Sequence, residues 1–123
     1  MRGYVTNIER ETVKNRNFRK VLFTAKHHQL VVMSLKPGED IGEETHRVDQ
    51  FIRVEQGQGV VVMGRKKSRI QADSAFVIPA GTKHNVINKS KNKDLKIYTV
   101  YSSPQHEDRA IHKTKEEAEE EEE

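Results

Sequence analysis

The apolar residues of this chain lie in short runs of strand length, separated by polar turns. Residues 21–23 and 30–35 are β-branched or otherwise apolar, and the polar segment 26–29 between them indicates a turn. Comparable runs follow at residues 51–55, 60–63, 75–78, 84–88 and 95–101, and Gly or Pro lies in each intervening turn except the polar segment 89–94. Short strands that recur at roughly 8–12-residue spacing predict an all-β sandwich or barrel.

The segment that begins at Gln50 shows the phase of one predicted strand. Side chains alternate between the two faces of a strand, so Gln50, Ile52 and Val54 share one face, while Arg53 and Glu55 share the other. We expect the apolar face, and Gln50 with it, to point into the core.

The two ends of the chain lack this pattern. Residues 1–20 are polar and interrupted by Asn, which predicts an arm with at most one short strand. Residues 104–123 are also polar, and seven of the last eight residues are Glu. Because these like charges repel one another and the segment has no apolar face, we expect a disordered acidic tail. The predicted organisation is an arm at 1–20, a barrel at 21–103 and a C-terminal segment at 104–123.

The composition favours one soluble domain. A chain of 123 residues is long enough to form a single core. The absence of Cys excludes a disulfide framework and a thiol nucleophile, and it leaves N and O atoms as the ligands of any metal. No segment has the apolar length of a signal peptide or a membrane span. We therefore expect a cytoplasmic protein without a membrane partner.

The formal net charge of +3 hides an uneven distribution. Residues 1–115 carry 22 basic and 12 acidic side chains, a net charge of +10, once the seven glutamates of the tail are set aside. Such a body could attract phosphate or nucleic acid, with the tail as an intramolecular competitor. We favour a simpler interpretation, in which the basic runs 65–69 and 89–93 solvate the outer faces of strands, because they lack the interleaved aromatic residues that stack on bases. Nucleic acid is therefore not an expected partner.

Two separate segments carry the candidate chemistry. Glu44 and His46 are two residues apart, so they project from the same face of an extended segment, and Gln50 keeps that parity. His84 follows a rigid corner, residues 79–82, that can fix its approach. Taken singly, His46 could be a surface histidine and His84 a core histidine. Together, the carboxylate, the two imidazoles and the amide suit Fe, Mn, Ni or Zn and suit Ca or Mg poorly.

These residues resemble the two sequence motifs of the cupin family. The first motif holds Gly, His, His, Glu and Gly at fixed offsets, and the corresponding residues here are Gly38, Glu44, His46, Gln50 and Gly57. The second holds Gly, Pro, Gly, His and Asn, and the corresponding residues are Asp73, Pro79, Gly81, His84 and Asn88. The resemblance implies a cupin-type double-stranded β-helix, or jelly-roll barrel. It also implies that a divalent transition metal ion is held by Glu44, His46, Gln50 and His84.

The first motif departs from the family pattern at two ligand positions. Glu44 replaces a His and Gln50 replaces a Glu, so the set keeps one carboxylate, and a divalent ion would form a site of net charge +1. Because an amide is a weaker ligand than a carboxylate, metal affinity is expected to fall. The alternative is that these residues hydrogen-bond a polar ligand directly. Asn88 is expected to be a hairpin-turn residue.

The resemblance leaves the reaction open, because cupins include dioxygenases, sugar isomerases and epimerases, decarboxylases and non-enzymatic binding proteins. It implies a metal-dependent enzyme that acts on a small sugar-like or hydroxy-acid metabolite, by isomerase-like or dioxygenase-like chemistry. The alternative is a barrel that binds a metabolite or a metal without turnover.

The remaining histidines and the oligomeric state complete the expectations. His106 and His112 are expected on the surface. If their segment folds back over the barrel mouth, Tyr101 and His106 could act as acid or base there. Cupin barrels commonly pair through an N-terminal strand, so we expect a homodimer that exchanges residues 1–20.

Overall fold

The computed structural model describes residues 2–122. In chain order the elements are α1 (Ile8–Lys14), β1 (Arg19–Thr24), β2 (Gln29–Leu35), β3 (Asp49–Gln56), β4 (Gln58–Met63), β5 (Lys66–Gln71), β6 (Ala75–Ile78), β7 (His84–Asn88), β8 (Leu95–Ser102), β9 (Ile111–His112) and α2 (Lys115–Glu122). In this part of the chain neither helix is long and apolar enough to cross a membrane.

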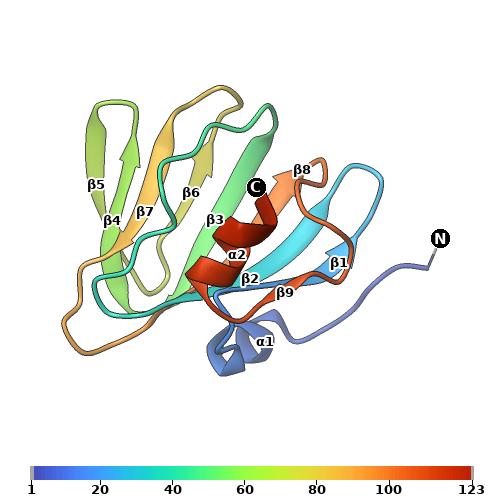
Figure 1. Ribbon diagram of the computed structural model, residues 1–123, viewed down its shortest axis with the longest axis horizontal. Helices are drawn as coiled ribbons and strands as arrows, with labels where there is room; N and C mark the ends of the chain where they lie inside the picture. Colours follow the sequence, from blue (N-terminus) through green and yellow to red (C-terminus); the bar gives the residue numbers. More distant parts are fainter. Residues whose placement is uncertain (1, 123) are drawn as a thin grey trace.

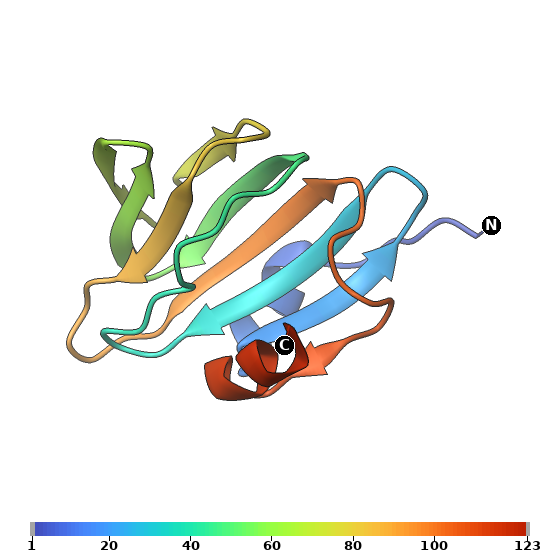
Figure 2. The same cartoon turned by 45° about the horizontal axis from the view of Figure 1, so that its top comes forward.

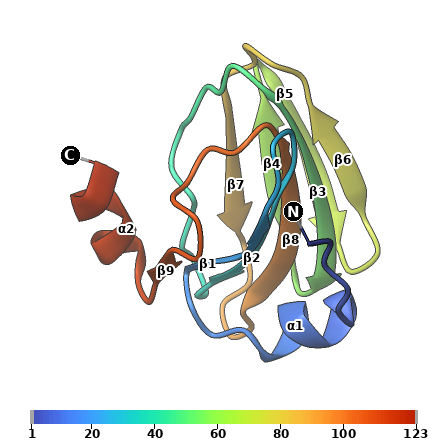
Figure 3. The same ribbon diagram turned by 90° about the vertical axis from the view of Figure 1, so that its right-hand side faces the viewer.

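The strands form two antiparallel sheets. The larger sheet has the strand order β6-β3-β8-β2-β1-β9, and the smaller sheet has the order β5-β4-β7. Figure 1 shows the small sheet at the left of the molecule, and Figure 3 shows the two sheets lying face to face. The predicted all-β jelly-roll barrel is confirmed by this arrangement.

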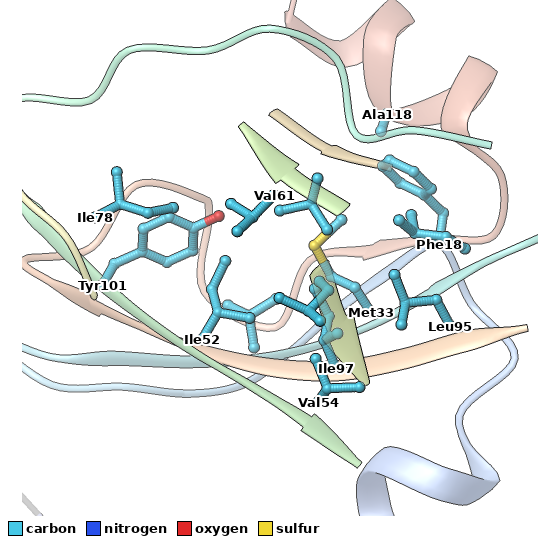
Figure 4. Packing of buried hydrophobic residues seen from close by; sticks show 14 of the residues in the cluster. Phe18, Met33, Ile52, Val54, Val61, Ile78, Leu95, Ile97, Tyr101 and Ala118 are labelled. Atoms are coloured by element: carbon cyan, nitrogen blue, oxygen red, sulfur yellow. The ribbon is translucent and has the colours of Figure 1, made fainter. Parts of the chain in front are cut away.

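Alternating inward side chains build the core between the sheets. In β3, Gln50, Ile52 and Val54 are buried and the residues between them are partly exposed, as the sequence predicted. Figure 4 shows the apolar members of this row packed among side chains of the neighbouring strands, including Met33, Val61, Leu95 and Ile97. Each fully buried aliphatic side chain of this kind contributes about 1.5–3 kcal/mol to the free energy of unfolding.

The N-terminal segment differs from the expected arm. Residues 8–14 form α1, and the Asn7 side chain caps this helix by accepting a hydrogen bond from the Arg10 amide at 3.0 Å. The helix contacts β2, β3 and β8, and Thr12 on the inner face of the helix is fully buried. An Asn that interrupts the apolar pattern therefore begins a helix here and does not extend a loop. The exchange of this segment in a homodimer stays a prediction.

The C-terminal segment also differs from the expected disordered tail. The Thr114 side chain accepts a hydrogen bond from the Glu117 amide at 3.1 Å and caps α2. Ala118 is 2% exposed and joins the core beside Phe18, as Figure 4 shows. The Lys115 ammonium pairs with the Asp40 carboxylate at 2.7 Å. A single small apolar residue and one ion pair therefore dock a helix that has too little apolar surface to be recognised from its sequence.

Candidate metal centre

The loop between β2 and β3 is bonded to β7, and this places the two sequence motifs side by side. Glu44 and His84 form an antiparallel bridge in which each amide donates to the other residue's carbonyl at 2.9 Å. At the corner before β7, the Gly81 amide donates to the His46 carbonyl at 2.8 Å. Figure 2 shows this loop running along β7. Backbone bonds therefore fix the approach of both motifs.

His84 is the first residue of β7, and its ring is held by the backbone. The residue is 5% exposed, and its Nδ1 lies 2.8 Å from the Thr82 carbonyl oxygen. Because a carbonyl can only accept a hydrogen bond, Nδ1 carries a proton, and in the neutral ring Nε2 keeps its lone pair. This is the tautomer expected of a histidine that binds a metal through Nε2.

Glu44, His46 and His84 each bring one ligand atom into a common cluster. These three atoms lie within 4.8 Å of one another. The Glu44 carboxylate oxygen is 3.8 Å from His46 Nε2, and the ring centroids of His46 and His84 are 5.4 Å apart. The three residues come from the loop and from β7, so the cluster exists only in the folded barrel.

Gln50 lies on the inner face of β3, directly opposite Tyr101 of β8. Its amide nitrogen donates to the Thr99 hydroxyl at 3.0 Å, so the amide oxygen faces away from Thr99. The ring of Tyr101 lies 5.4 Å from the ring of His46, at an angle of 81°. Gln50 is therefore next to Tyr101, whose ring contacts His46 of the cluster. The hydrogen bond to Thr99 occupies the amide nitrogen of Gln50 and leaves its oxygen free to bind a ligand.

The Glu44 carboxyl is ionised more readily than an ordinary glutamate. Burial alone would raise its pKa, but the interaction with His46 and the positive charges of Arg19 and of His84, when that ring is protonated, outweigh burial and hold the pKa below its usual value. A carboxylate that stays charged is the form that binds a metal ion.

The donor atoms fit a divalent transition metal ion. Two buried atoms, His46 Nε2 and Gln50 Oε1, have no hydrogen-bond partner among the described residues. An unpaired buried polar atom costs about 1–3 kcal/mol, so two at one end of the barrel indicate a missing partner. A cation would satisfy Gln50 Oε1, and also His46 Nε2 when that ring carries its proton on Nδ1. Glu44, His46 and His84 are grouped as predicted. The role of Gln50 as a ligand stays a prediction.

Tyr101 and His106 extend this site toward the barrel mouth. The Tyr101 hydroxyl lies 3.4 Å from His106 Nε2, and the two rings meet edge to face with centroids 5.3 Å apart. The expected surface placement of His106 is therefore wrong. The chain after β8 folds back over the barrel, as the alternative prediction for this segment required. His112 was also expected on the surface and is 4% exposed, because β9 pairs with β1.

A buried glutamine that the sequence did not single out holds this segment in place. The Gln29 side chain is fully buried, and its oxygen accepts hydrogen bonds from the amides of Gln105 at 2.9 Å and His106 at 3.0 Å. Its nitrogen donates to the His106 carbonyl at 2.8 Å and to the Thr24 hydroxyl at 3.0 Å. The only local signal was a Gln at the edge of an apolar run, which equally fits a turn.

Arg19 is a second functional candidate that the sequence did not reveal. It points inward from β1, opposite Met33, is 2% exposed, and its Nη1 lies 3.4 Å from His112 Nδ1. With Glu44 and Lys115 it lines a small cavity of about 160 Å³ beneath α2. Arg19 lay inside the segment assigned to an arm, so its burial could not be expected.

The partly buried position of His106 gives the protein a specific acid sensitivity. Burial, assisted by the charge of Arg19, lowers the pKa of His106 from 6.5 to about 3, whereas Glu44 opposes this shift. Between these values only the unfolded chain binds a proton at this residue, so the free energy of unfolding falls as the pH drops from about 6.5 toward 3.

We expect the wild-type protein to lose about 1–2 kcal/mol more stability than His106→Gln between pH 7 and pH 4.5, after allowance for solvent screening. Urea unfolding at the two pH values measures the difference. The control is His27→Gln, which alters an exposed histidine of the β1–β2 turn and should leave the wild-type pH dependence unchanged. Equal losses for His106→Gln and the wild type would contradict the prediction.

Comparisons with known sequences agree with this geometry. Residues 31–101 match the family model of the cupin domain. The chain is 49% identical over 122 residues to the uncharacterized protein YrkC of Bacillus subtilis, which covers 94% of this chain and 65% of that protein. It is 46% identical over 107 residues to an uncharacterized protein of Acanthamoeba polyphaga mimivirus, covering 84% of this chain and 67% of that protein. The chain thus spans about two thirds of the length of these curated relatives.

Solved structures resemble the whole barrel. The crystal structure of BH2720 from Bacillus halodurans has a TM-score of 0.93 and 46% identity, covering 97% of this chain and 95% of that one. The structure of KdgF from a Halomonas species has a TM-score of 0.63 and 24% identity, covering 71% of this chain and 79% of that one. The second likeness shows the fold alone.

Proposed function

The chain belongs to the cupin domain family, and on that premise we propose that its barrel binds a divalent transition metal ion and acts on a small polar, oxygenated metabolite. The observation that carries the proposal is the cluster of Glu44, His46 and His84, whose ligand atoms lie within 4.8 Å of one another. The unpaired lone pairs of His46 and Gln50 support it.

Each residue of the site has a distinct role in this proposal. Glu44, His46 and His84 bind the ion, and the Gln50 amide oxygen, oriented by Thr99, supplies a weaker ligand. Fe, Mn, Ni and Zn are the candidate ions, because the donors are imidazole nitrogens and oxygens. When bound, such an ion supplies a Lewis acid that polarises a carbonyl or a pair of hydroxyl groups.

Tyr101 and His106 would move protons beside the ligands. The Tyr101 ring meets the His46 ring edge to face, and the Tyr101 hydroxyl lies 3.4 Å from His106 Nε2. Because His106 stays neutral, with a pKa of about 3, its Nε2 can accept a hydrogen bond from the Tyr101 hydroxyl when the ring is protonated at Nδ1. A proton held between these two groups suits isomerase-like or epimerase-like chemistry on a sugar-like or hydroxy-acid molecule.

Exchange of substrate hydrogen for deuterium tests this function. The metal-loaded protein is incubated in deuterium oxide with aldoses, ketoses and 2-hydroxy acids, and proton NMR follows deuterium incorporation and product formation. We expect Tyr101→Phe to lower turnover by about 100-fold or more and to retain its metal. The matched control is Tyr98→Phe, which alters a partly exposed tyrosine of the same strand.

One result would correct the role of Tyr101, and another would contradict the enzymatic proposal. Turnover that survives in Tyr101→Phe would remove that residue from the chemistry. A metabolite that binds without metal and is never converted would instead identify a binding barrel.

A further inference from the structure

The outer face of the small sheet carries an apolar groove. Val61 of β4 and Val86 of β7 are each 1% exposed and point into the core. Because side chains alternate along a strand, Val60, Val62 and Ile87 point to the opposite face, where the register pairs Val60 with Ile87. These three residues are partly exposed and form the floor of a groove of about 270 Å³, called here the β4 groove.

The rim of the β4 groove is basic. Lys67 and Arg69 of β5 and Lys89, just after β7, line it. Residues 56–72 and 82–93 contain eight Lys or Arg and no Asp or Glu. In the described part of the chain the only ion pair made by these eight joins Lys83 to Glu43 at 3.0 Å, so the three rim cations have no carboxylate partner.

We propose that the β4 groove binds an extended acidic peptide segment of a partner protein. Aliphatic side chains of the peptide would lie on the valine and isoleucine floor, and its carboxylates would pair with Lys67, Arg69 and Lys89. The charge of the rim selects an anionic partner, and the floor selects one that also carries apolar side chains. β5 is the edge strand of the small sheet, so the main chain of an extended peptide can lie along it.

The lining favours a peptide over nucleic acid. None of the residues that line the groove is aromatic, so bases would find no stacking surface. The groove is also separate from the candidate metal centre, because His84 points into the core from β7, whereas Ile87 of the same strand points outward. Peptide binding and metal binding should therefore respond to different substitutions.

Fluorescence polarisation with a labelled nonapeptide of alternating Glu and Val tests the proposal. We expect binding by the wild-type protein that weakens with salt and a loss of affinity of about 30-fold in Lys67→Glu with Arg69→Glu. The matched control, Lys26→Glu with Lys113→Glu, changes the net charge equally at exposed positions outside the groove and should lose about 3-fold at most. Metal content and thermal melting confirm that each variant is folded.

Substitution of the floor separates specific docking from plain charge attraction. Val60→Thr with Ile87→Thr should weaken the Glu-Val peptide about 10-fold, and a Glu-Ser peptide should bind about as weakly to the wild type. The proposal fails if the charge control loses as much affinity as the rim variant. It also fails if the Glu-Ser peptide equals the Glu-Val peptide, if a single-stranded oligonucleotide binds more tightly than either, or if no peptide binds at low salt.

Discussion

Replacement of His84 by alanine is expected to abolish stoichiometric binding of a divalent transition metal ion by the purified protein. His84 supplies one of the three clustered ligands, and its ring is held by the Thr82 carbonyl, so no other side chain can take over its position. Loss of an outer partner of a ligand typically lowers metal affinity 10–100-fold, and loss of the ligand itself should lower it by more than about 100-fold. Elemental analysis and calorimetric titration with Mn, Fe, Ni and Zn salts measure the effect.

Two further variants sharpen this test. His28→Ala removes an imidazole from the exposed β1–β2 turn and should bind metal as the wild type does. Gln50→Glu replaces the amide by a carboxylate and should tighten binding, because a charged oxygen is the stronger ligand. Metal retained at wild-type affinity in His84→Ala would show that Glu44, His46 and His84 do not form the site.

The sequence predicted the barrel because its signals are local and repeated. Strand-length apolar runs, turn residues between them and the phase of β3 all depend on near neighbours in the chain. The grouping of Glu44, His46 and His84 was also predictable, since Glu44 and His46 share one segment and the second motif specifies the corner before His84. Asn88 was expected to be a hairpin-turn residue, but it is the last residue of β7, and its side chain holds the turn that follows: it donates to the Leu35 and Lys93 carbonyls and accepts from the Ser90 amide.

What the sequence could not predict depends on contacts between distant segments. His112 is buried because β9 pairs with β1, and His106 is partly buried because Gln29 binds its loop; no local pattern reports either contact. Ala118 docks in a gap beside Phe18 that is visible only in the folded chain. The same holds for Arg19, whose inward direction follows from its pairing with Met33. These residues all lie on one side of the barrel, so the part of the site that they form could not be predicted from the sequence.

The motif glycines show that the two cupin motifs contain residues required for the backbone conformation as well as residues proposed to bind the metal. Gly38, Gly57 and Gly81 all have positive φ values, of 78°, 96° and 83°. Asp73, which occupies a glycine position of the second motif, also has a positive φ of 77°. An aspartate tolerates this conformation better than most residues, so the backbone shape is kept although the residue type changes.

Replacement of Gly57 by alanine is expected to destabilise the protein more than the same change at Gly81. A Cβ atom at Gly57 would lie 2.5 Å from the Asp94 carbonyl oxygen, in addition to the strain of its positive φ, whereas a Cβ at Gly81 would meet no atom within 4 Å. We expect losses of about 3–5 kcal/mol and about 1–2 kcal/mol, respectively, in the free energy of unfolding. Gly3→Ala is the control, because Gly3 has open space and no positive φ.

Urea unfolding of the metal-free proteins separates the two classes of motif residue. Without metal, His84→Ala reports only the packing of one side chain, whereas Gly57→Ala reports the clash with the Asp94 carbonyl in full. Gly57→Ala should thus have low stability but bind metal normally where it is folded, and His84→Ala should show the reverse. A loss below about 1 kcal/mol for Gly57→Ala would mean that the turn after β3 relaxes to admit a methyl group. The fold would then not require a glycine at the last position of the first motif.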